Sequence, residues 1–161
     1  MPCIVRELFA AAGAIPVGPV EWGTRLPSEE PGVYIVTLMD DADGCNGRKK
    51  APIYPEYAGK LRERWLPGEV VLYIGMTKRS LRKRLDEFYK HRLGDRRPHA
   101  GGQWIKALKN LTELHIFWAE HCDPARAEEA MLRRFKQSTH GRLPFANRRD
   151  PTKTGRRDSA P

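Results

Sequence analysis

Cysteine is scarce in this sequence, which has three cysteines in 161 residues. Cys3, Cys45 and Cys122 are far apart and form no C-x-x-C pair, which excludes a disulfide framework and argues against a structural zinc site. This usage is typical of a reducing, cytoplasmic setting. Long apolar runs are also lacking, and none reaches the length that a membrane-spanning helix needs.

Acidic residues are the minority among the charges, with 20 Asp and Glu against 29 Lys and Arg and a net charge of +9. On so small a domain this excess favours a polyanionic partner, although a basic protein that is merely soluble explains the charge equally well. The length gives room for one domain with one sizeable insertion.

The N-terminal residues 1–31 are predicted to form an irregular lead-in, rich in Pro and Gly after residue 15. The stretch LFAAAGAI at 8–15 predicts a short amphipathic helix that Gly13 and Pro16 close. A secretion signal is the alternative interpretation, but it requires a basic segment ahead of the apolar run, which is absent here.

Two predicted strands flank a long insertion. GVYIVTL at 32–38 is rich in β-branched and aromatic residues, and VVLYI at 70–74 is a second such run, which Gly75 ends. Residues 39–69 between them are polar and turn-rich, with one short helix around 57–65. We expect this insertion to bear specificity and to be dispensable for folding, because the flanking strands can pair without it.

The second half of the chain is predicted to be mainly helical. The predicted elements are a helix over 80–90 capped by Ser80, a loop at 94–102, a helix over 103–111, a strand over 114–119, a helix over 124–137 capped by Asp123, and a basic, flexible tail over 148–161. This order predicts an α+β domain with a small three-stranded, mainly antiparallel sheet flanked by helices.

Glu128 is the most informative single residue. Successive residues of a helix are about 100° apart, which places Glu128 in the middle of the apolar stripe formed by Met131, Leu132 and Phe135. Glu129 points about a quarter-turn away. A carboxylate facing the core is costly unless it is compensated, so either a bound metal ion or a structural salt bridge with an arginine would explain Glu128.

Arg84 borders the apolar face of the preceding helix, one turn before Phe88. Arg82 borders the other side of that face, and periodicity does not separate the two arginines. Because a charged helix is commonly no more than a solvated face, a role for Arg84 depends on residues elsewhere in the chain.

These residues combine into an ordered pattern. GVY at 32–34, YIG at 73–75, SLRKRL at 80–85, AEEAMLRRF at 127–135 and PFAN at 144–147 resemble the motifs of the GIY-YIG nuclease family. Each tripeptide alone is a weak signal, but a chance match of the whole ordered set is improbable. The resemblance covers residues 32–147 and implies a GIY-YIG-like nuclease domain with both tripeptides on adjacent strands.

The resemblance also implies roles for the matching residues. Glu128 would bind one Mg²⁺ (or Mn²⁺) ion, and Arg84 would hold phosphate oxygens. Tyr34, aided by Tyr73, would accept the proton of the attacking water. A phenol is a weak base, so we expect nearby cations to lower the pKa of Tyr34. His99 resembles a histidine that some members carry, with an ordinary loop histidine as the alternative interpretation.

Contacts with nucleic acid are predicted around this site, because basic segments suit phosphates. The residues expected to make them are Gly75, Lys78, Arg79, Arg82, Arg96, Arg97, Asn147, Arg148 and Arg149. Trp104, Trp118 and Phe135 lie in periodic apolar runs and are predicted to be core residues, not base-stacking ones.

Two features depart from the family pattern. The link between the tripeptides is several times longer than usual, which we interpret as specificity-bearing. Many members also have His or Tyr one turn after the arginine, where this chain has Phe88. Tyr89 and His91 are the candidates to replace it.

The sequence therefore predicts a metal-dependent endonuclease of the restriction or repair type, cytoplasmic and without a membrane partner, that acts on nucleic acid and above all on DNA. Double-strand cutting by a subunit with one site would need a homodimer or two successive nicks. Two alternatives remain: a related domain that only binds nucleic acid, and a basic domain that docks an acidic protein. The second alternative leaves Glu128 unexplained.

Overall fold

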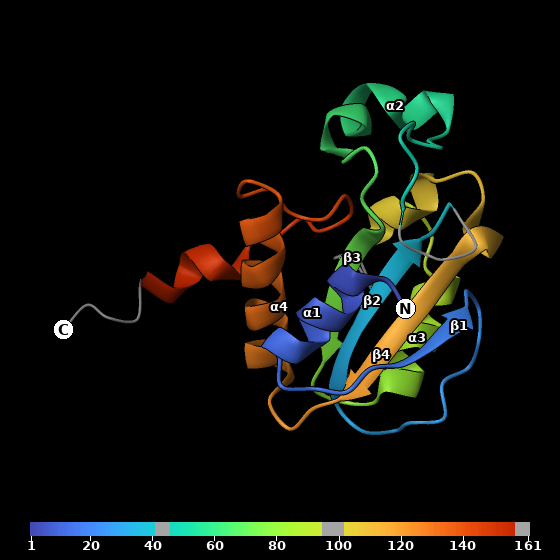
Figure 1. Cartoon of the computed structure of the whole chain (residues 1–161). Helices are drawn as coiled ribbons and strands as arrows, with labels where there is room; N and C mark the ends of the chain where they lie inside the picture. The colour runs from blue at the N-terminus through green and yellow to red at the C-terminus, as the bar shows by residue number, and fades with distance from the viewer. Residues whose placement is uncertain (41–45, 95–101, 157–161) are drawn as a thin grey trace.

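The computed structural model describes residues 1–40, 46–94 and 102–156 of the chain. Within these ranges, four antiparallel strands form one sheet in the order β1-β4-β2-β3, with helices on both faces (Figure 1). The strands are β1 (Val17–Glu21), β2 (Gly32–Leu38), β3 (Val71–Thr77) and β4 (Leu114–Glu120). The α-helices are α1 (Cys3–Ala11), α2 (Pro55–Leu61), α3 (Leu81–Lys90) and α4 (Pro124–Ser138). The 3₁₀ helices are η1 (Arg62–Arg64), η2 (Gln103–Ala107), η3 (Leu111–Glu113) and η4 (Pro151–Arg156).

The alternation of side chains along β2 divides the core into two layers. Val33 and Ile35 belong to the layer that α1 and α4 cover, whereas Tyr34 and Val36 belong to the layer that α3 covers. Figure 1 shows α1 and α4 side by side on the near face of the sheet and α3 behind it. All seven residues of β2 are buried, as expected for a central strand covered on both faces.

The fourth strand, β1, corrects the prediction of a three-stranded sheet and an irregular lead-in. β1 is the outer strand and pairs with β4, with Val20 opposite Ile116. The sequence concealed it because Gly18 and Pro19 interrupt the run, and proline within a sheet is tolerated at an edge. A side chain at Gly18 would place its Cβ 2.7 Å from the carbonyl oxygen of Ile116. Close pairing with β4 therefore requires this glycine.

The helix ends agree with the predicted capping chemistry in α3 and α4. The Ser80 side chain accepts a hydrogen bond from the Lys83 amide at 3.2 Å, and the Asp123 side chain accepts one from the Arg126 amide at 3.3 Å. The helix expected over 8–15 lies earlier in the chain, as α1. It ends before Gly13, whose φ of +67° does not continue a helix.

The predicted helix over 103–111 is wrong. This segment contains η2 and then leaves helical geometry, because Leu108 forms an isolated antiparallel bridge with Ile53 of the insertion. The pairing depends on a residue 55 positions away (108 − 53), which local periodicity does not reveal.

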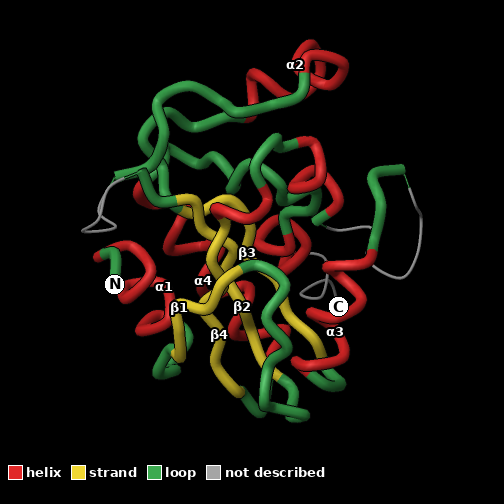
Figure 2. The backbone as a smooth tube through the Cα atoms, turned by 90° about the vertical axis from the view of Figure 1, so that its right-hand side faces the viewer, coloured by secondary structure: helices red, strands yellow, loops and turns green. Residues whose placement is uncertain are grey.

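The insertion is part of the core, contrary to the expectation that it is dispensable. Its helices lie at one end of the sheet (Figure 1 and Figure 2). Ile53, Ala58, Leu61 and Trp65 from this segment are buried in the layer that also contains Tyr34. The Trp65 ring also contacts that of Phe145, with centroids 5.4 Å apart. Shortening the insertion would therefore open the core.

Part of the expected flexible tail is ordered. Residues 151–156 form η4, and the Lys136 ammonium lies 2.7 Å from the Asp150 carboxylate, which fastens the tail to α4. This ion pair and bonds to Thr152 hold the pKa of Asp150 below its usual value, although burial acts in the opposite direction. No helix in the described part of the chain is both long and apolar enough to cross a membrane.

Candidate active site

Tyr34 and Tyr73 come together across the pair of strands β2 and β3. Tyr34 lies opposite Gly75 and Tyr73 lies opposite Val36, so both rings lie on the same face, with centroids 6.0 Å apart. A Cβ atom at Gly75 would lie 2.6 Å from Cζ of Tyr34 and 2.7 Å from Cε1 of Tyr73. Gly75 has no side chain, and the two tyrosine rings pack into the space that a side chain would fill. Gly75 is buried beneath their rings inside β3, which corrects its predicted role in ending the strand; its role in binding nucleic acid stays a prediction.

Phe88 of α3 completes an aromatic cluster with the two tyrosines. Its centroid lies 6.3 Å from that of Tyr34 and 5.7 Å from that of Tyr73. Phe88 is fully buried and has no group that could transfer a proton. Tyr89 does not replace it, because its hydroxyl donates to the carbonyl of Thr24 at 2.8 Å. Burial also raises the pKa of Tyr89.

Arg84 and Arg82, which periodicity could not separate, have different surroundings. Arg82 is a structural residue: its guanidinium donates to the carbonyls of Leu26 at 2.9 Å and Pro27 at 2.6 Å, and it pairs with Glu29 at 3.0 Å. These bonds fix α3 to the lead-in, and the contact of Arg82 with nucleic acid stays a prediction. Arg84 instead donates a hydrogen bond to the hydroxyl of Tyr34.

The hydroxyl of Tyr34 is the centre of the electrostatic network. Burial raises the pKa of Tyr34 to about 12, while the charge and hydrogen bond of Arg84 lower it. Glu128 raises it and a hydrogen bond with Tyr73 lowers it. The expected effect of a nearby cation is thus present, but complete burial outweighs it. The pKa of Tyr73 is also raised well above its ordinary value, mainly by burial.

Glu128 approaches this network from α4. Its neighbours Ala127, Met131 and Leu132 are buried, whereas Glu128 itself is half-buried. Glu128 belongs to the helix on the near face, yet it acts on tyrosines of the far layer. Its charge therefore raises the pKa of both Tyr34 and Tyr73.

Glu128 has no structural partner among the described residues: no hydrogen bond or ion pair holds its carboxylate. Burial raises its pKa to about 7, and the charge of Arg84 acts in the opposite direction. A half-buried carboxylate with this pKa is poised to bind a cation. The alternative interpretation, compensation by an arginine, is represented by Arg84, whose charge lowers the pKa of Glu128.

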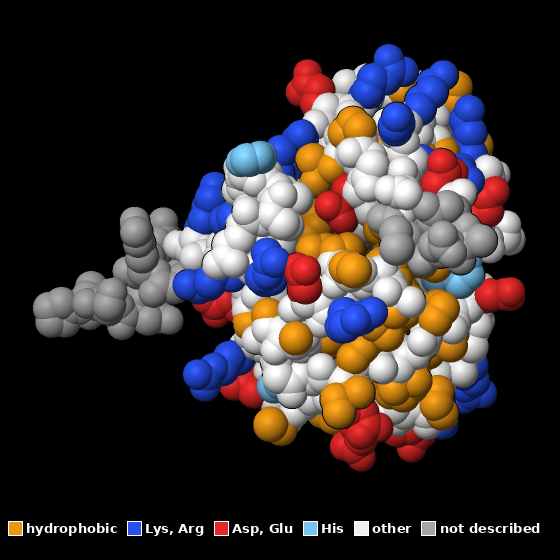
Figure 3. All heavy atoms as spheres, in the orientation of Figure 1, with side chains coloured by type: hydrophobic (Ala, Val, Ile, Leu, Met, Phe, Trp, Pro, Cys, Tyr) orange, Lys and Arg blue, Asp and Glu red, His pale blue; other side chains and the backbone are white. Residues whose placement is uncertain are grey.

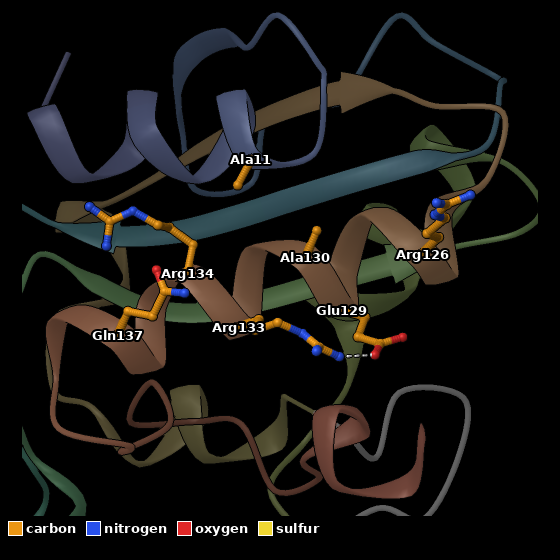
Figure 4. A pocket seen from close by; sticks show the side chains of 7 residues that line it. All are labelled: Ala11, Arg126, Glu129, Ala130, Arg133, Arg134 and Gln137. Carbon is orange, nitrogen blue, oxygen red and sulfur yellow. Dashed lines mark hydrogen bonds and ion pairs between the residues drawn. The ribbon is translucent and has the colours of Figure 1, made fainter. Parts of the chain in front are cut away.

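Glu129 is oriented differently and serves another purpose. It forms an i,i+4 ion pair with Arg133 on the outer side of α4, drawn as a dashed line in Figure 4. The pair lines a shallow pocket of about 370 Å³ between α4 and Ala11 of α1. Tyr34, Arg84 and Glu128 do not line this pocket, so it is separate from the tyrosine cluster.

Asn147 fastens the C-terminal segment to the site. Its side-chain oxygen accepts a hydrogen bond from the Ile74 amide at 2.9 Å, and its side-chain nitrogen donates to the Ile74 carbonyl at 2.9 Å. Ile74 lies between Tyr73 and Gly75, so Asn147 holds the strand that carries both. The side chain is buried, and its amide is used within the protein, so the contact of Asn147 with nucleic acid stays a prediction.

The remaining predicted contact residues are basic and exposed, or lie outside the described ranges. Lys78, Arg79, Arg148 and Arg149 are exposed. Arg96, Arg97 and His99 fall outside the described residues. Figure 3 shows Lys and Arg side chains gathered at the end of the molecule where α2 lies.

The donor set fits a hard divalent cation with few protein ligands. In the described part of the chain there is no group of three His, Cys, Asp or Glu that could form a protein-only metal site. Mg²⁺ commonly takes one or two carboxylates and completes its shell with water and substrate phosphates. Glu128 meets that requirement because its carboxylate forms no ion pair with a described residue and is partly open to solvent.

Two residues near the site were missed by sequence reasoning. Trp104 was predicted to be a core residue, but it is half-buried, with the guanidinium carbon of Arg64 4.4 Å from its ring centroid. The contact joins the insertion to η2, 40 positions away (104 − 64), so no local pattern indicates it.

Comparison with protein-family models, with curated proteins and with solved structures finds no match to this chain.

Proposed function

We propose that this protein is a metal-dependent endonuclease that hydrolyses phosphodiester bonds in nucleic acid, with DNA as its main substrate. The observation that carries the proposal is the meeting of Tyr34, Arg84 and Glu128 around one buried hydroxyl. These residues come from β2, α3 and α4. They are the positions at which the sequence resembles the GIY-YIG nucleases, and proximity in space is what shared chemistry requires.

Arg84 is suited to bind the phosphoryl group. A guanidinium stays charged at all working pH values and presents a planar set of donors that matches phosphate oxygens. Arg84 already donates to Tyr34, so a phosphate held there would lie beside the phenol. Positive charge at this point stabilises the negative charge that develops during hydrolysis.

Glu128 is the residue that would hold Mg²⁺ or Mn²⁺. The ion, when bound, supplies positive charge to the phosphate oxygens and lowers the pKa of coordinated water. With a pKa of about 7, Glu128 is only partly ionised at neutral pH. A bound ion would keep it in the carboxylate form.

Tyr34 is the proposed proton acceptor, with Tyr73 hydrogen-bonded to it. Accepting a proton from water requires the phenolate form, so the pKa of about 12 must fall when substrate binds. Arg84 acts in this direction. Phe88 excludes water from the inner side of the rings, since it is fully buried against both.

A nucleic-acid-binding domain without catalytic activity is the second candidate. The observation that favours it is the burial of Tyr34, whose pKa burial raises in the protein alone. Under this alternative, the arginines still bind phosphate but no bond is cut.

Incubation of the purified protein with plasmid, single-stranded DNA and RNA, with and without Mg²⁺, separates the two candidates. We expect Mg²⁺-dependent cleavage that Tyr34→Phe and Glu128→Gln each abolish. Binding to all three polymers without cleavage of any would favour the inactive domain. We also propose a cytoplasmic location, which the exposed free thiols of Cys3 and Cys122 support.

A further inference from the structure

Three arginines converge beside the candidate active site, at the junction of the insertion and the C-terminal segment. Arg64 belongs to η1, and Arg142 and Arg148 flank the segment that carries Asn147. Burial lowers the pKa of Arg64, and the charges of Arg142 and Arg148 lower it further. The last two effects mean that Arg142 and Arg148 each repel the guanidinium group of Arg64.

No carboxylate neutralises this arginine cluster within the described ranges of the chain. None of Arg64, Arg142 and Arg148 belongs to an ion pair there. Other arginines of the protein do pair with acidic residues, among them Arg48 and Arg134. The cluster therefore differs from these paired arginines because its members have no carboxylate partner, not because of its number of charges.

The cluster is held in place by backbone carbonyls and one aromatic ring. Arg64 donates to the carbonyls of Phe145 at 3.2 Å and Asn147 at 2.5 Å. Its guanidinium carbon lies 4.4 Å from the ring centroid of Trp104, and that of Arg148 lies 5.3 Å from the same centroid. Stacking on an aromatic ring orients a guanidinium and leaves its in-plane donors available.

Asn147 connects this cluster to the site. Its carbonyl accepts from Arg64, while its side chain binds the backbone of Ile74 between Tyr73 and Gly75. The cluster therefore continues the surface that runs along the outer edge of β3. An elongated polyanion bound at Arg84 would extend in this direction.

We propose that Arg64 and Arg148, both oriented by Trp104, together with Arg142 bind a phosphate of the nucleic-acid backbone flanking the one that is cut. Oriented guanidinium groups without a carboxylate partner match phosphodiester oxygens, and repulsion among them is relieved when an anion binds. The nucleic-acid identity of the partner rests on the proposed function. The cluster is a binding element, and Arg64 also fixes the C-terminal segment.

The test uses Arg142→Gln/Arg148→Gln, because both residues are exposed and Arg64 supports the fold. Binding of a fluorescent DNA duplex is measured without divalent cations over a range of salt concentrations. We expect the log–log slope to become shallower by about one unit, since the cluster contacts one phosphate and each phosphate contact contributes about 0.9. Arg6→Gln and Arg62→Gln, both exposed and outside the cluster, provide a double control with the same loss of charge and an unchanged slope.

An unchanged slope in the cluster variant, or an equal change in the control, would overturn the proposal. Polyglutamate of matched charge is the competitor: displacement of DNA at equal concentration would mean a general acidic partner and would also overturn it. Cleavage is not part of this measurement. A wild-type protein that binds with the expected slope but never cuts DNA would refute the proposed endonuclease and leave the phosphate site standing.

Discussion

Arg84 and Glu128 project from helices on opposite faces of the sheet, yet both act on the hydroxyl of Tyr34, in opposite directions. Arg84 lowers the pKa of the phenol, and Glu128 raises it. Neutralising Glu128 with a cation would remove the opposing effect and leave that of Arg84. The arrangement couples cation binding to the readiness of Tyr34 to accept a proton.

The first prediction concerns Glu128→Gln. We expect it to abolish Mg²⁺-dependent cleavage and to raise the stability of the metal-free protein at alkaline pH. Burial raises the pKa of Glu128 to about 7, above its ordinary value of 4.5. The folded protein therefore loses stability as pH rises through this interval, by roughly 2 kcal/mol after allowance for partial exposure. Thermal unfolding of both proteins at acidic and alkaline pH should show a gain that grows with pH.

Glu129→Gln is the matched control for that experiment. Its side chain forms an ion pair with Arg133 on the outer side of α4, so cleavage should remain at the wild-type level. Loss of cleavage in Glu129→Gln, with activity retained in Glu128→Gln, would refute the assignment.

The second prediction is that Mg²⁺ affinity depends on pH through Glu128. Since the ion binds the carboxylate form, affinity should rise about tenfold between one unit below and one unit above the pKa of about 7. Isothermal titration calorimetry on the protein without nucleic acid measures this directly. A pH-independent affinity would mean that another group holds the ion.

The third prediction separates Arg84 from Arg82. Arg84→Lys keeps the charge but loses the planar fork, so kcat should fall roughly 10²- to 10³-fold with little change in melting temperature. Arg82→Lys should instead lower the melting temperature, because its guanidinium bridges the carbonyls of Leu26 and Pro27. Steady-state kinetics and thermal unfolding of both variants measure these effects. A fall in kcat for Arg82→Lys and a fall in melting temperature for Arg84→Lys would contradict these roles.

The fourth prediction tests Gly75. Gly75→Ala places a methyl group 2.6 Å from the Tyr34 ring, so we expect a loss of about 1–3 kcal/mol in unfolding free energy together with reduced cleavage. Gly59→Ala in α2 is the control. No atom lies within 4 Å of a Cβ built there, so that substitution should stabilise the protein by about 0.5–1 kcal/mol. Chemical denaturation of the two variants decides between these outcomes.

The fifth prediction concerns the insertion. Trp65→Ala should lower the unfolding free energy by about 3–5 kcal/mol, because the ring is buried against Phe145 and its indole nitrogen donates to the carbonyl of Arg48 at 3.1 Å. Urea denaturation measures the loss. A change below 1 kcal/mol would restore the view that residues 39–69 are dispensable for folding.

Local patterns in the sequence were sufficient for much of the fold. The β-branched and aromatic residues at 32–38 identified β2, the apolar run at 114–119 identified β4, and capping residues identified α3 and α4. β1 escaped because Gly18 and Pro19 break the run and only pairing with β4 makes it a strand. The segment at 103–111 has helical periodicity, but the bridge between Ile53 and Leu108 overrides it.

Local patterns in the sequence also predicted part of the candidate site. The inward position of Glu128 follows from helical geometry, whereas the distinction between Arg84 and Arg82 depends on carbonyls in the lead-in. The net direction of the Tyr34 pKa shift depends on complete burial, which a sequence does not display. The arginine cluster around Trp104 depends on contacts between segments that are distant in the chain.

The bonds from Asn147 to Ile74 also bear on how the protein avoids self-association. β3 is an outer strand, and an outer strand offers unpaired backbone groups to a neighbouring molecule. Asn147 occupies the amide and carbonyl of Ile74, and the Ala146 amide donates to the Leu72 carbonyl at 2.8 Å. At the opposite edge, Pro19 removes a donor from β1. Both edges of the sheet are therefore poor templates for aggregation.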